Sequence, residues 1–270
     1  MLVEFLLLFL SLLFTMIGSM TFWQVHEPLD FYKPLVLFIG GYLISMIFTW
    51  TIFELTTLTI KKDKVYEKPN RFSRLIFNSA LSYVDLHALI KLKVNGLYKV
   101  PKNERYLLVC NHRSNFDSMI VSKVLKRHYI AFIAKESLFK IPIGGKHMRR
   151  LCYLSIDRTD NLQSLAVMKK AEEYIENNAT SIGVFPEGKR QQEKTIGDFH
   201  EGVFNIAIKS QCPIVICTLK GTQDIKTNFP FKRTAVTLDF IETLNYEDYG
   251  GFNAKQLSDI VQDKMIQNLC

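Results

Sequence analysis

The chain has 270 residues, of which 48% are hydrophobic, and it carries a formal net charge of +8. This length accommodates one sizeable folded domain and an additional segment. On charge alone, nucleic acid, anionic lipid and phosphorylated substrates all stay open as partners, because a basic excess attracts polyanions. The five cysteines are odd in number and form no C-x-x-C pair, which argues against a disulfide framework and against a zinc site.

The chain begins with two long apolar runs, residues 2–23 and 34–53. The first run contains Glu4 as its only charge, and the second contains none. Each approaches the roughly 20 apolar residues that cross a bilayer, and neither has the polar face of a soluble helix. The alternative for the first run is a signal peptide, but it has no basic segment before it and no clear cleavage site after it. We expect a membrane-embedded helical hairpin over residues 1–60.

The charges that flank the two runs predict the topology. Glu27 and Asp30 outnumber Lys33 between the runs, and six basic residues follow the second run. Because positive residues stay on the cytoplasmic side, we expect both ends of the hairpin there, with the remaining chain facing the cytoplasm at the cell membrane. The basic residues would contact an anionic membrane surface; the alternatives are a solvated linker and a helical pair that enters one leaflet without crossing. The six residues are Lys61, Lys62, Lys64, Lys68, Arg71 and Arg74.

Residues 61–90 are predicted to form a basic linker that leads into a helix. Within residues 72–90, apolar side chains recur at roughly helical spacing. The pattern fits a helix that packs on the core, which we favour, and also an amphipathic helix at a membrane interface.

Residues 91–270 are predicted to form an α/β domain, with a mixed central sheet flanked by helices. Short β-like runs alternate with helical stretches, which is typical of such a sheet. In folds of this kind, functional residues lie in loops beyond the strand ends. Strands are expected at Tyr106–Cys110, Tyr129–Ala134, Cys152–Ile156, Ser181–Phe185, Pro213–Leu219 and Ala235–Phe240, and helices at 116–127, 162–177, 202–209 and 254–267.

The segment CNHRSNFDS, residues 110–118, directly follows an apolar strand and contains His112 and Asp117 with the spacing His-x4-Asp. A carboxylate on one imidazole nitrogen fixes the tautomer and stabilises the imidazolium that forms during proton transfer. The other ring nitrogen can then act as a general base. The alternative is a helix N-cap formed by Ser114 or Asn115 beside a solvated histidine.

The segment FPEGKR, residues 185–190, also follows an apolar strand. Proline and glycine favour a tight loop, which would present Glu187, Lys189 and Arg190 together. A guanidinium binds a phosphate monoester through two hydrogen bonds, and Glu187 would either hold Arg190 or accept a hydrogen bond from a glycerol hydroxyl. An ordinary charged turn is the alternative.

Two further strand ends carry cations. Arg158 follows the strand that ends at Ile156, and Lys135 follows the strand YIAFIA. If the four strands are adjacent, the His112 pair, Lys135, Arg158 and the Glu187 loop converge on one site. Arg158 and Lys135 are then candidate phosphate ligands.

In order and type, these segments resemble the four blocks of the glycerolipid acyltransferase family. NHRSNFD resembles the His-x4-Asp block, YLSIDR the second block with its substrate-binding arginine, FPEGKR the third block, and CPIVICTL the apolar fourth block. AKESLFKIPIGG is similar to the linking segment of bacterial 1-acylglycerol-3-phosphate acyltransferases. The resemblance covers about residues 90–220, and two apolar N-terminal helices also fit the family. Two residues differ from the family pattern. In FPEGKR, Lys189 replaces the usual threonine of the third block. In FHEG, residues 199–202, which resembles the Phe-Lys-x-Gly that often follows this block, His200 replaces a common lysine.

The resemblance implies an acyltransferase in phospholipid biosynthesis. His112, held by Asp117, would take the proton from the sn-2 hydroxyl of 1-acylglycerol 3-phosphate, and the alkoxide would attack an acyl thioester on coenzyme A or acyl carrier protein to give phosphatidic acid. No bound cofactor, no metal and no nucleic acid partner is expected. The substrate-binding residues would be Lys135, Arg158, Glu187, Gly188, Lys189 and Arg190, supported by Asn111, Arg113, Ser114 and Pro186.

Three other functions stay open. The acyl acceptor could be glycerol 3-phosphate or another lysophospholipid. A lipid hydrolase could use the same histidine. A non-catalytic membrane protein could bind anionic lipid through its basic surface.

Overall fold

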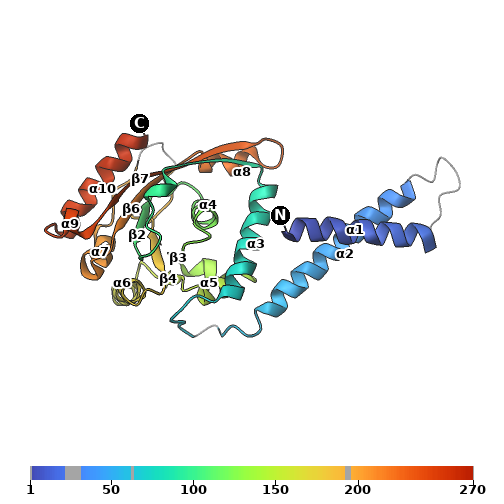
Figure 1. The fold of residues 1–270 in the computed structure, drawn as a ribbon, viewed down its shortest axis with the longest axis horizontal. Helices are drawn as coiled ribbons and strands as arrows, with labels where there is room; N and C mark the ends of the chain where they lie inside the picture. Colours follow the sequence, from blue (N-terminus) through green and yellow to red (C-terminus); the bar gives the residue numbers. More distant parts are fainter. Residues whose placement is uncertain (1, 22–31, 62–63, 192–195, 270) are drawn as a thin grey trace. The chain divides into compact units, whose positions relative to one another are not determined.

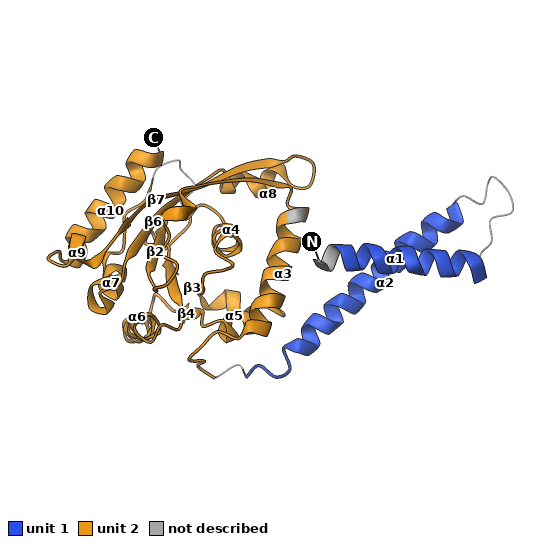
Figure 2. Ribbon diagram, viewed as in Figure 1, with its two compact units in different colours: residues 1–61 blue, residues 62–270 orange. Residues whose placement is uncertain are grey.

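The computed structural model describes residues 2–21, 32–61, 64–191 and 196–269 (Figure 1). Glu27, Asp30 and Lys62, on which the topology prediction depends, lie outside the described residues. The chain divides into two compact units, residues 1–61 and 62–270 (Figure 2).

The first unit is a hairpin of two apolar helices, α1 (Leu2–Thr21) and α2 (Tyr32–Thr56). The helices run antiparallel, because Gly18 faces Leu37 and Gly41 faces Phe14. A Cβ at Gly41 would lie 2.8 Å from a Phe14 ring atom, so a glycine is needed for this close approach. The expected helical hairpin is confirmed.

Helix α2 has the length and composition of a membrane-spanning helix. It has 25 residues with a mean hydropathy of 2.0 in its most apolar window, and only 11% of that window is buried. Helix α1 is a shorter apolar helix over its residues Phe5–Thr21. Whether the hairpin crosses the bilayer or enters one leaflet stays a prediction.

The second unit is built on a seven-stranded sheet with the strand order β1-β7-β6-β2-β5-β3-β4. All neighbouring strands are parallel except β6 and β7, which pair antiparallel. The predicted mixed sheet is therefore confirmed. The strands are β1 (Ile90–Asn95), β2 (Leu107–Cys110), β3 (Ile130–Lys135), β4 (Leu154–Ile156), β5 (Ser181–Val184), β6 (Ile214–Lys220) and β7 (Thr234–Leu244).

Helices cover both faces of this sheet, so the flanking helices are also confirmed (Figure 1). Helices α3, α4 and α5 lie on one side, and α6, α7 and α10 lie on the other. The α-helices of this unit are α3 (Arg71–His87), α4 (Asp117–Val124), α5 (Gly144–Arg150), α6 (Asn161–Glu176), α7 (Asn205–Ser210), α8 (Ile225–Asn228), α9 (Tyr246–Tyr249) and α10 (Ala254–Leu269). Short 3-10 helices are η2 (Leu97–Lys99), η3 (Glu136–Lys140), η4 (Glu201–Phe204) and η5 (Thr222–Asp224).

The helix expected over residues 72–90 is too long at its C-terminal end. Helix α3 ends at His87, and Leu89 adopts a left-handed conformation with φ 51° before strand β1 begins. The apolar side chains of α3 differ in burial: Leu81 is buried, whereas Phe72 and Leu75 are more than half exposed. The core-packing interpretation therefore describes only part of the helix.

Candidate active site

Four neighbouring parallel strands bring the predicted segments to one edge of the sheet. Strands β2, β5, β3 and β4 lie side by side in that order. The carboxyl ends of parallel strands meet at one edge, which we call the motif edge. His112 follows β2, Glu187 follows β5, Lys135 ends β3 and Arg158 follows β4. The four strand ends are adjacent, as the sequence interpretation required.

His112 and Asp117 form a direct pair. The Nδ1 atom of His112 lies 2.8 Å from Oδ2 of Asp117. The same oxygen accepts hydrogen bonds from the backbone N–H groups of Arg113, at 2.6 Å, and Ser114, at 2.7 Å. One carboxylate oxygen therefore holds both the imidazole and the loop that precedes α4. The alternative, a Ser114 or Asn115 cap beside a solvated histidine, does not describe the site, because the N-cap residue of α4 is Phe116 and His112 pairs with Asp117. Among the described residues, Ser114 Oγ accepts a hydrogen bond only from the backbone N–H of Phe116, at 3.4 Å.

The surroundings of the pair fix the orientation of the imidazole. Asp117 is fully buried, whereas the His112 side chain is 20% exposed. The His112 ring stacks on Phe185 with their centroids 4.4 Å apart, and Phe132 stacks behind Phe185 at 5.4 Å. Since Nδ1 contacts the carboxylate, Nε2 is the ring nitrogen left for a proton transfer.

Glu187 joins the two principal segments. Its Oε1 accepts a hydrogen bond from the backbone N–H of His112 at 2.7 Å, and its Oε2 accepts one from Gly197 at 3.0 Å. The backbone N–H of Gln191 in turn donates to the carbonyl of His112 at 2.9 Å. Burial raises the pKa of Glu187, although both backbone hydrogen bonds oppose this shift. In the structure the carboxylate contacts backbone N–H groups, where the sequence suggested Arg190 or a substrate hydroxyl.

Gly188 allows two other groups to approach the FPEGKR loop. It has φ 68°, and a Cβ there would lie 2.7 Å from Cδ2 of His200 and 3.7 Å from Nη1 of Arg158. The backbone N–H of His200 donates to the carbonyl of Pro186 at 2.8 Å. Arg158 therefore lies beside the loop, as the convergence of strand ends predicted, and burial lowers the pKa of its guanidinium.

The remaining predicted cations are exposed on the motif edge. Lys135 pairs in register with Ile156, which places it beside the turn that carries Arg158. Lys189 and Arg190 follow Gly188 and are also exposed. The structure thus groups the His–Asp pair, Glu187, Gly188 and Arg158 through described contacts, and leaves Lys135, Lys189 and Arg190 around them.

Asn111 has a structural connection that the sequence did not reveal. Its side-chain oxygen accepts from the backbone N–H of Leu219 at 2.7 Å, and its amide donates to the carbonyl of the same residue at 3.0 Å. The start of the His-x4-Asp segment is therefore fixed to the end of β6, which belongs to the apolar fourth segment. The sequence analysis also missed the supporting roles of Gly197, Phe132 and His200. Of the residues that support the site, only Phe185 gave a sequence signal, since it directly follows a strand.

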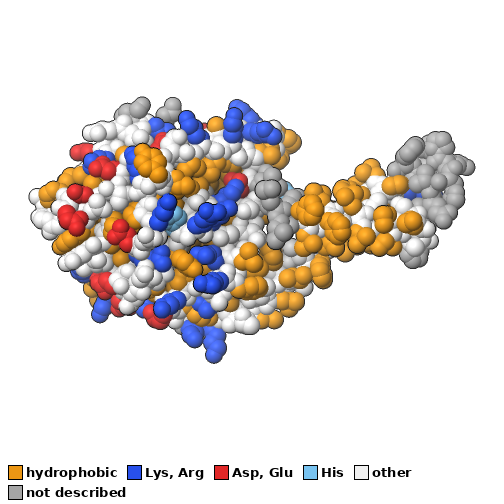
Figure 3. Space-filling view, viewed as in Figure 1, with side chains coloured by type: hydrophobic (Ala, Val, Ile, Leu, Met, Phe, Trp, Pro, Cys, Tyr) orange, Lys and Arg blue, Asp and Glu red, His pale blue; other side chains and the backbone are white. Residues whose placement is uncertain are grey.

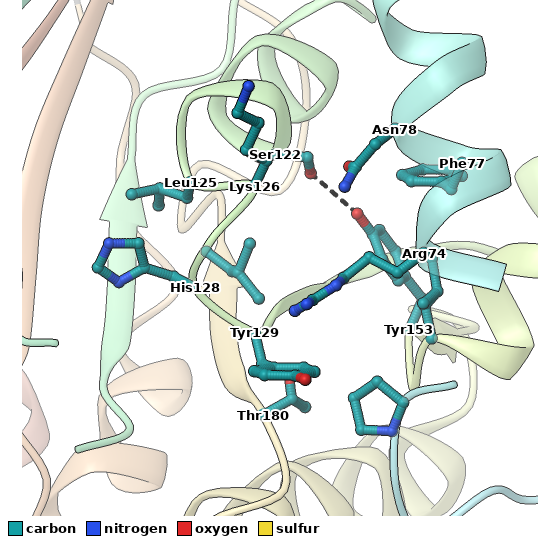
Figure 4. Close-up of a pocket in the computed structure, with 13 residues that line it drawn as sticks. Arg74, Phe77, Asn78, Ser122, Leu125, Lys126, His128, Tyr129, Tyr153 and Thr180 are labelled. Carbon is teal, nitrogen blue, oxygen red and sulfur yellow. Dashed lines mark hydrogen bonds between the residues drawn. The ribbon is translucent and has the colours of Figure 1, made fainter. Parts of the chain in front are cut away.

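A separate pocket lies at the opposite end of the sheet (Figure 4). It is lined by residues that precede β3 and β5, including Tyr129 and Thr180, and by Arg74 of α3. The Arg74 guanidinium lies over the Tyr129 ring, 3.9 Å from its centroid. None of the predicted site residues lines this pocket, so it is distinct from the His112 site.

An α/β sheet with a His–Asp pair and cations at adjacent strand ends defines a class of proteins that can perform proton-coupled transfer on an anionic substrate. Comparisons with known proteins narrow this class. The family model described as Acyltransferase matches residues 91–220. The chain is 30% identical over 195 residues to the "Probable 1-acyl-sn-glycerol-3-phosphate acyltransferase" of Mycoplasma pneumoniae, covering 67% of this chain and 70% of that relative. The chain belongs to the acyltransferase family.

Other relatives match a smaller part. A chloroplastic 1-acyl-sn-glycerol-3-phosphate acyltransferase, BAT2 of Brassica napus, is 29% identical over 53% of this chain and 41% of its own length. The alpha enzyme of that name from Ovis aries is 28% identical over 50% of this chain and 47% of its own length. The matched segment thus spans less than half of these relatives. The crystal structure of the 1-acyl-sn-glycerophosphate acyltransferase PlsC from Thermotoga maritima has a TM-score of 0.58 at 20% identity, covering 97% of this chain and 94% of that one, which supports the fold.

Proposed function

We propose that the protein transfers a fatty acyl group from an acyl thioester to the sn-2 hydroxyl of 1-acylglycerol 3-phosphate, giving phosphatidic acid. The observation that carries this proposal is the His112–Asp117 pair at 2.8 Å, beside a loop approached by Arg158. The names of the relatives support the same acceptor.

The chemistry assigned to the pair is general-base catalysis. Nε2 of His112 takes the proton from the acceptor hydroxyl, and Asp117 stabilises the imidazolium that forms. The alkoxide attacks the thioester carbonyl, a new ester C–O bond forms and the C–S bond breaks. The thiolate of coenzyme A or acyl carrier protein leaves and takes the proton back from His112, so the enzyme returns to its starting state.

The cations of the motif edge are assigned to the phosphate of the acceptor. Arg158 and Arg190 would bind it through charge-assisted hydrogen bonds, with Lys135 and Lys189 adding positive charge. Glu187 is assigned a positioning role, because both of its oxygens accept hydrogen bonds from the backbone. It would hold the base and the FPEGKR loop at a fixed separation.

The apolar hairpin of the first unit would keep the enzyme at the lipid bilayer. Acceptor and product are bilayer lipids, whereas the thioester donor comes from the cytosol. We assign the second unit to the cytoplasmic face of the cell membrane, where the two substrates meet.

The test uses purified full-length protein, lysophosphatidic acid and an acyl thioester. We expect phosphatidic acid from the wild type and none above background from His112→Ala. The Arg190→Ala variant should raise the KM for the acceptor more than it lowers kcat. Phosphatidic acid formation that survives His112→Ala would rule out the mechanism.

An acceptor and product panel separates the remaining functions. Faster turnover with glycerol 3-phosphate or with a lysophospholipid of larger headgroup would replace the proposed acceptor. Release of free fatty acid without an acylated product would identify a hydrolase.

A further inference from the structure

The connection between β6 and β7 carries two aromatic side chains on the motif edge. Lys220, the last residue of β6, pairs with Thr237, so residues 221–233 extend beyond the sheet at the end where β6 finishes. Strand β2 runs parallel to β6, with Cys110 opposite Cys217, and His112 follows β2 at this same end. The connection therefore faces the same side of the second unit as the His112 site.

Phe229 and Phe231 are held in an exposed position by the backbone around them. Phe231 is 95% exposed and Phe229 is 50% exposed. The N–H groups of Phe231 and Lys232 both donate to the carbonyl of Asn228, at 3.1 and 2.8 Å. The Asn228 side chain donates to Oγ1 of Thr234 at 2.9 Å, which ties the turn to the start of β7. The turn is braced by these hydrogen bonds, and the described residues leave the Phe231 ring almost fully exposed and the Phe229 ring half exposed.

Positive side chains flank these two aromatic residues along the chain. Lys226, Lys232 and Arg233 are exposed, against a single exposed acidic residue, Asp224, within residues 221–233. Figure 3 shows Lys and Arg side chains beside apolar ones at the α8 end of the second unit. Aromatic rings flanked by cations match the headgroup region of an anionic bilayer, where rings reach the acyl boundary and cations meet lipid phosphates.

We propose that the Phe229–Arg233 turn inserts into the surface of an anionic lipid bilayer and holds the motif edge against it. This contact is separate from the apolar helices of the first unit. The role of this contact in catalysis rests on the proposed function. If that function holds, the contact would place the base next to the headgroup layer that contains the acceptor. The contact itself does not require turnover.

The matched control is Tyr98, an aromatic residue that is 83% exposed on η2. The hydroxyl of Thr243 donates to the carbonyl of Lys99 at 2.8 Å, so η2 lies near the end of β7. Since Leu244 pairs with Ile214 at the start of β6, Tyr98 lies at the opposite end of the sheet from the motif edge.

The experiment follows the fluorescence of one indole in the full chain. The native tryptophans are Trp23 and Trp50, and both are replaced by phenylalanine. Phe231→Trp or Tyr98→Trp is then introduced, and the protein is reconstituted into vesicles of phosphatidylcholine and phosphatidylglycerol with or without brominated acyl chains. We expect a blue-shifted emission that brominated lipid quenches for Phe231→Trp, and an unshifted, unquenched emission for Tyr98→Trp.

Three results would overturn the proposal. An emission typical of water for Phe231→Trp would mean that the turn does not touch lipid. A blue shift without quenching would mean that protein covers the turn, either the first unit or a second copy of the chain. Equal quenching of both indoles would mean that the turn has no preference for lipid.

A kinetic arm links the contact to activity. We expect Phe229→Ser/Phe231→Ser to lower the rate with lysophosphatidic acid in anionic vesicles, and to leave the rate with a short-chain, water-soluble acceptor unchanged. Equal losses with both acceptors would contradict a lipid-contact role. If the wild type does not acylate either acceptor, the proposed function fails while the quenching result still decides the lipid contact.

Discussion

Replacing Asp117 with asparagine removes one charge from the His–Asp pair and leaves an oxygen that can still accept hydrogen bonds. An amide oxygen in the place of Oδ2 could keep the contacts with the N–H groups of Arg113 and Ser114. The amide nitrogen would take the place of Oδ1, which is buried and has no hydrogen-bond partner among the described residues. Burying an unpaired polar group costs about 1–3 kcal/mol, and we expect that loss in the free energy of unfolding.

The loss of catalysis should be larger than this loss of stability. With Nδ1 and Oδ2 2.8 Å apart, the imidazolium and carboxylate charge centres lie about 4 Å apart, where an ion pair contributes about 4 kcal/mol at an effective dielectric constant near 20. Asparagine cannot supply this stabilisation when His112 takes the proton. The expected loss in kcat is therefore about 10³-fold.

The assay compares acyl transfer and thermal unfolding for the same preparations. The control is Asp160→Asn, because Asp160 caps α6 by accepting from the N–H of Gln163 at 3.0 Å and has no contact with His112. Asparagine caps a helix as well as aspartate, so this control should keep both activity and stability. If Asp117→Asn stays folded and keeps its activity within about tenfold of the wild type, the carboxylate charge does not assist proton transfer.

Three further variants test the surrounding groups. Glu187→Gln leaves one of two backbone N–H groups without an acceptor, so denaturant unfolding should show a loss of about 1–3 kcal/mol. Burial raises the pKa of Glu187 above its ordinary 4.5, so the wild type should lose stability as the pH rises through the raised value, and the glutamine variant should lack this loss. Gly188→Ala should lower the melting temperature, because its Cβ would meet His200 at φ 68°. Gly202→Ala serves as control, because its Cβ would meet no described atom within 4 Å. Arg158→Ala should raise the KM for the acceptor about 10- to 100-fold with a smaller change in kcat, since a hydrogen bond to a charged group contributes about 1.5–3 kcal/mol.

Much of the fold follows from apolar patterning. The six predicted strands are all present. Apolar runs such as those of β2 and β6 are short and almost wholly buried in the sheet. Strand β1 was missed because IKLKVN alternates lysine with apolar residues at the sheet edge. Its alternation has the period of a strand, but the apolar helix pattern immediately before it extended the predicted helix through Ile90. The short helices α8 and α9 have four residues each, too few to show a helical period.

The candidate site also has features that the sequence predicts and features that it cannot predict. Strand ends can be found from sequence, so His112, Arg158 and Glu187 could each be placed at one. The partners of Glu187 could not be found, because both are backbone N–H groups, and one belongs to Gly197, ten residues further along the chain. Backbone donors have no sequence signature. The contact of Asn111 with Leu219 escapes for a related reason, since it depends on β2 and β6 being neighbours, which only the strand order reveals.

The bridge made by Glu187 gives a physical reason for a fixed acceptor position. A carboxylate beside an acceptor phosphate would repel it, so a buried glutamate in the proposed phosphate site is better explained by a positioning role. Here it connects the backbone of His112 to Gly197 and sits directly before Gly188, where Arg158 approaches. His112, the proposed base, and the candidate phosphate-binding loop are therefore connected by hydrogen bonds. If the phosphate is held on that loop, the hydroxyl that reaches Nε2 is selected by its distance from the phosphate, and the bridge would contribute to the choice of hydroxyl without touching the substrate.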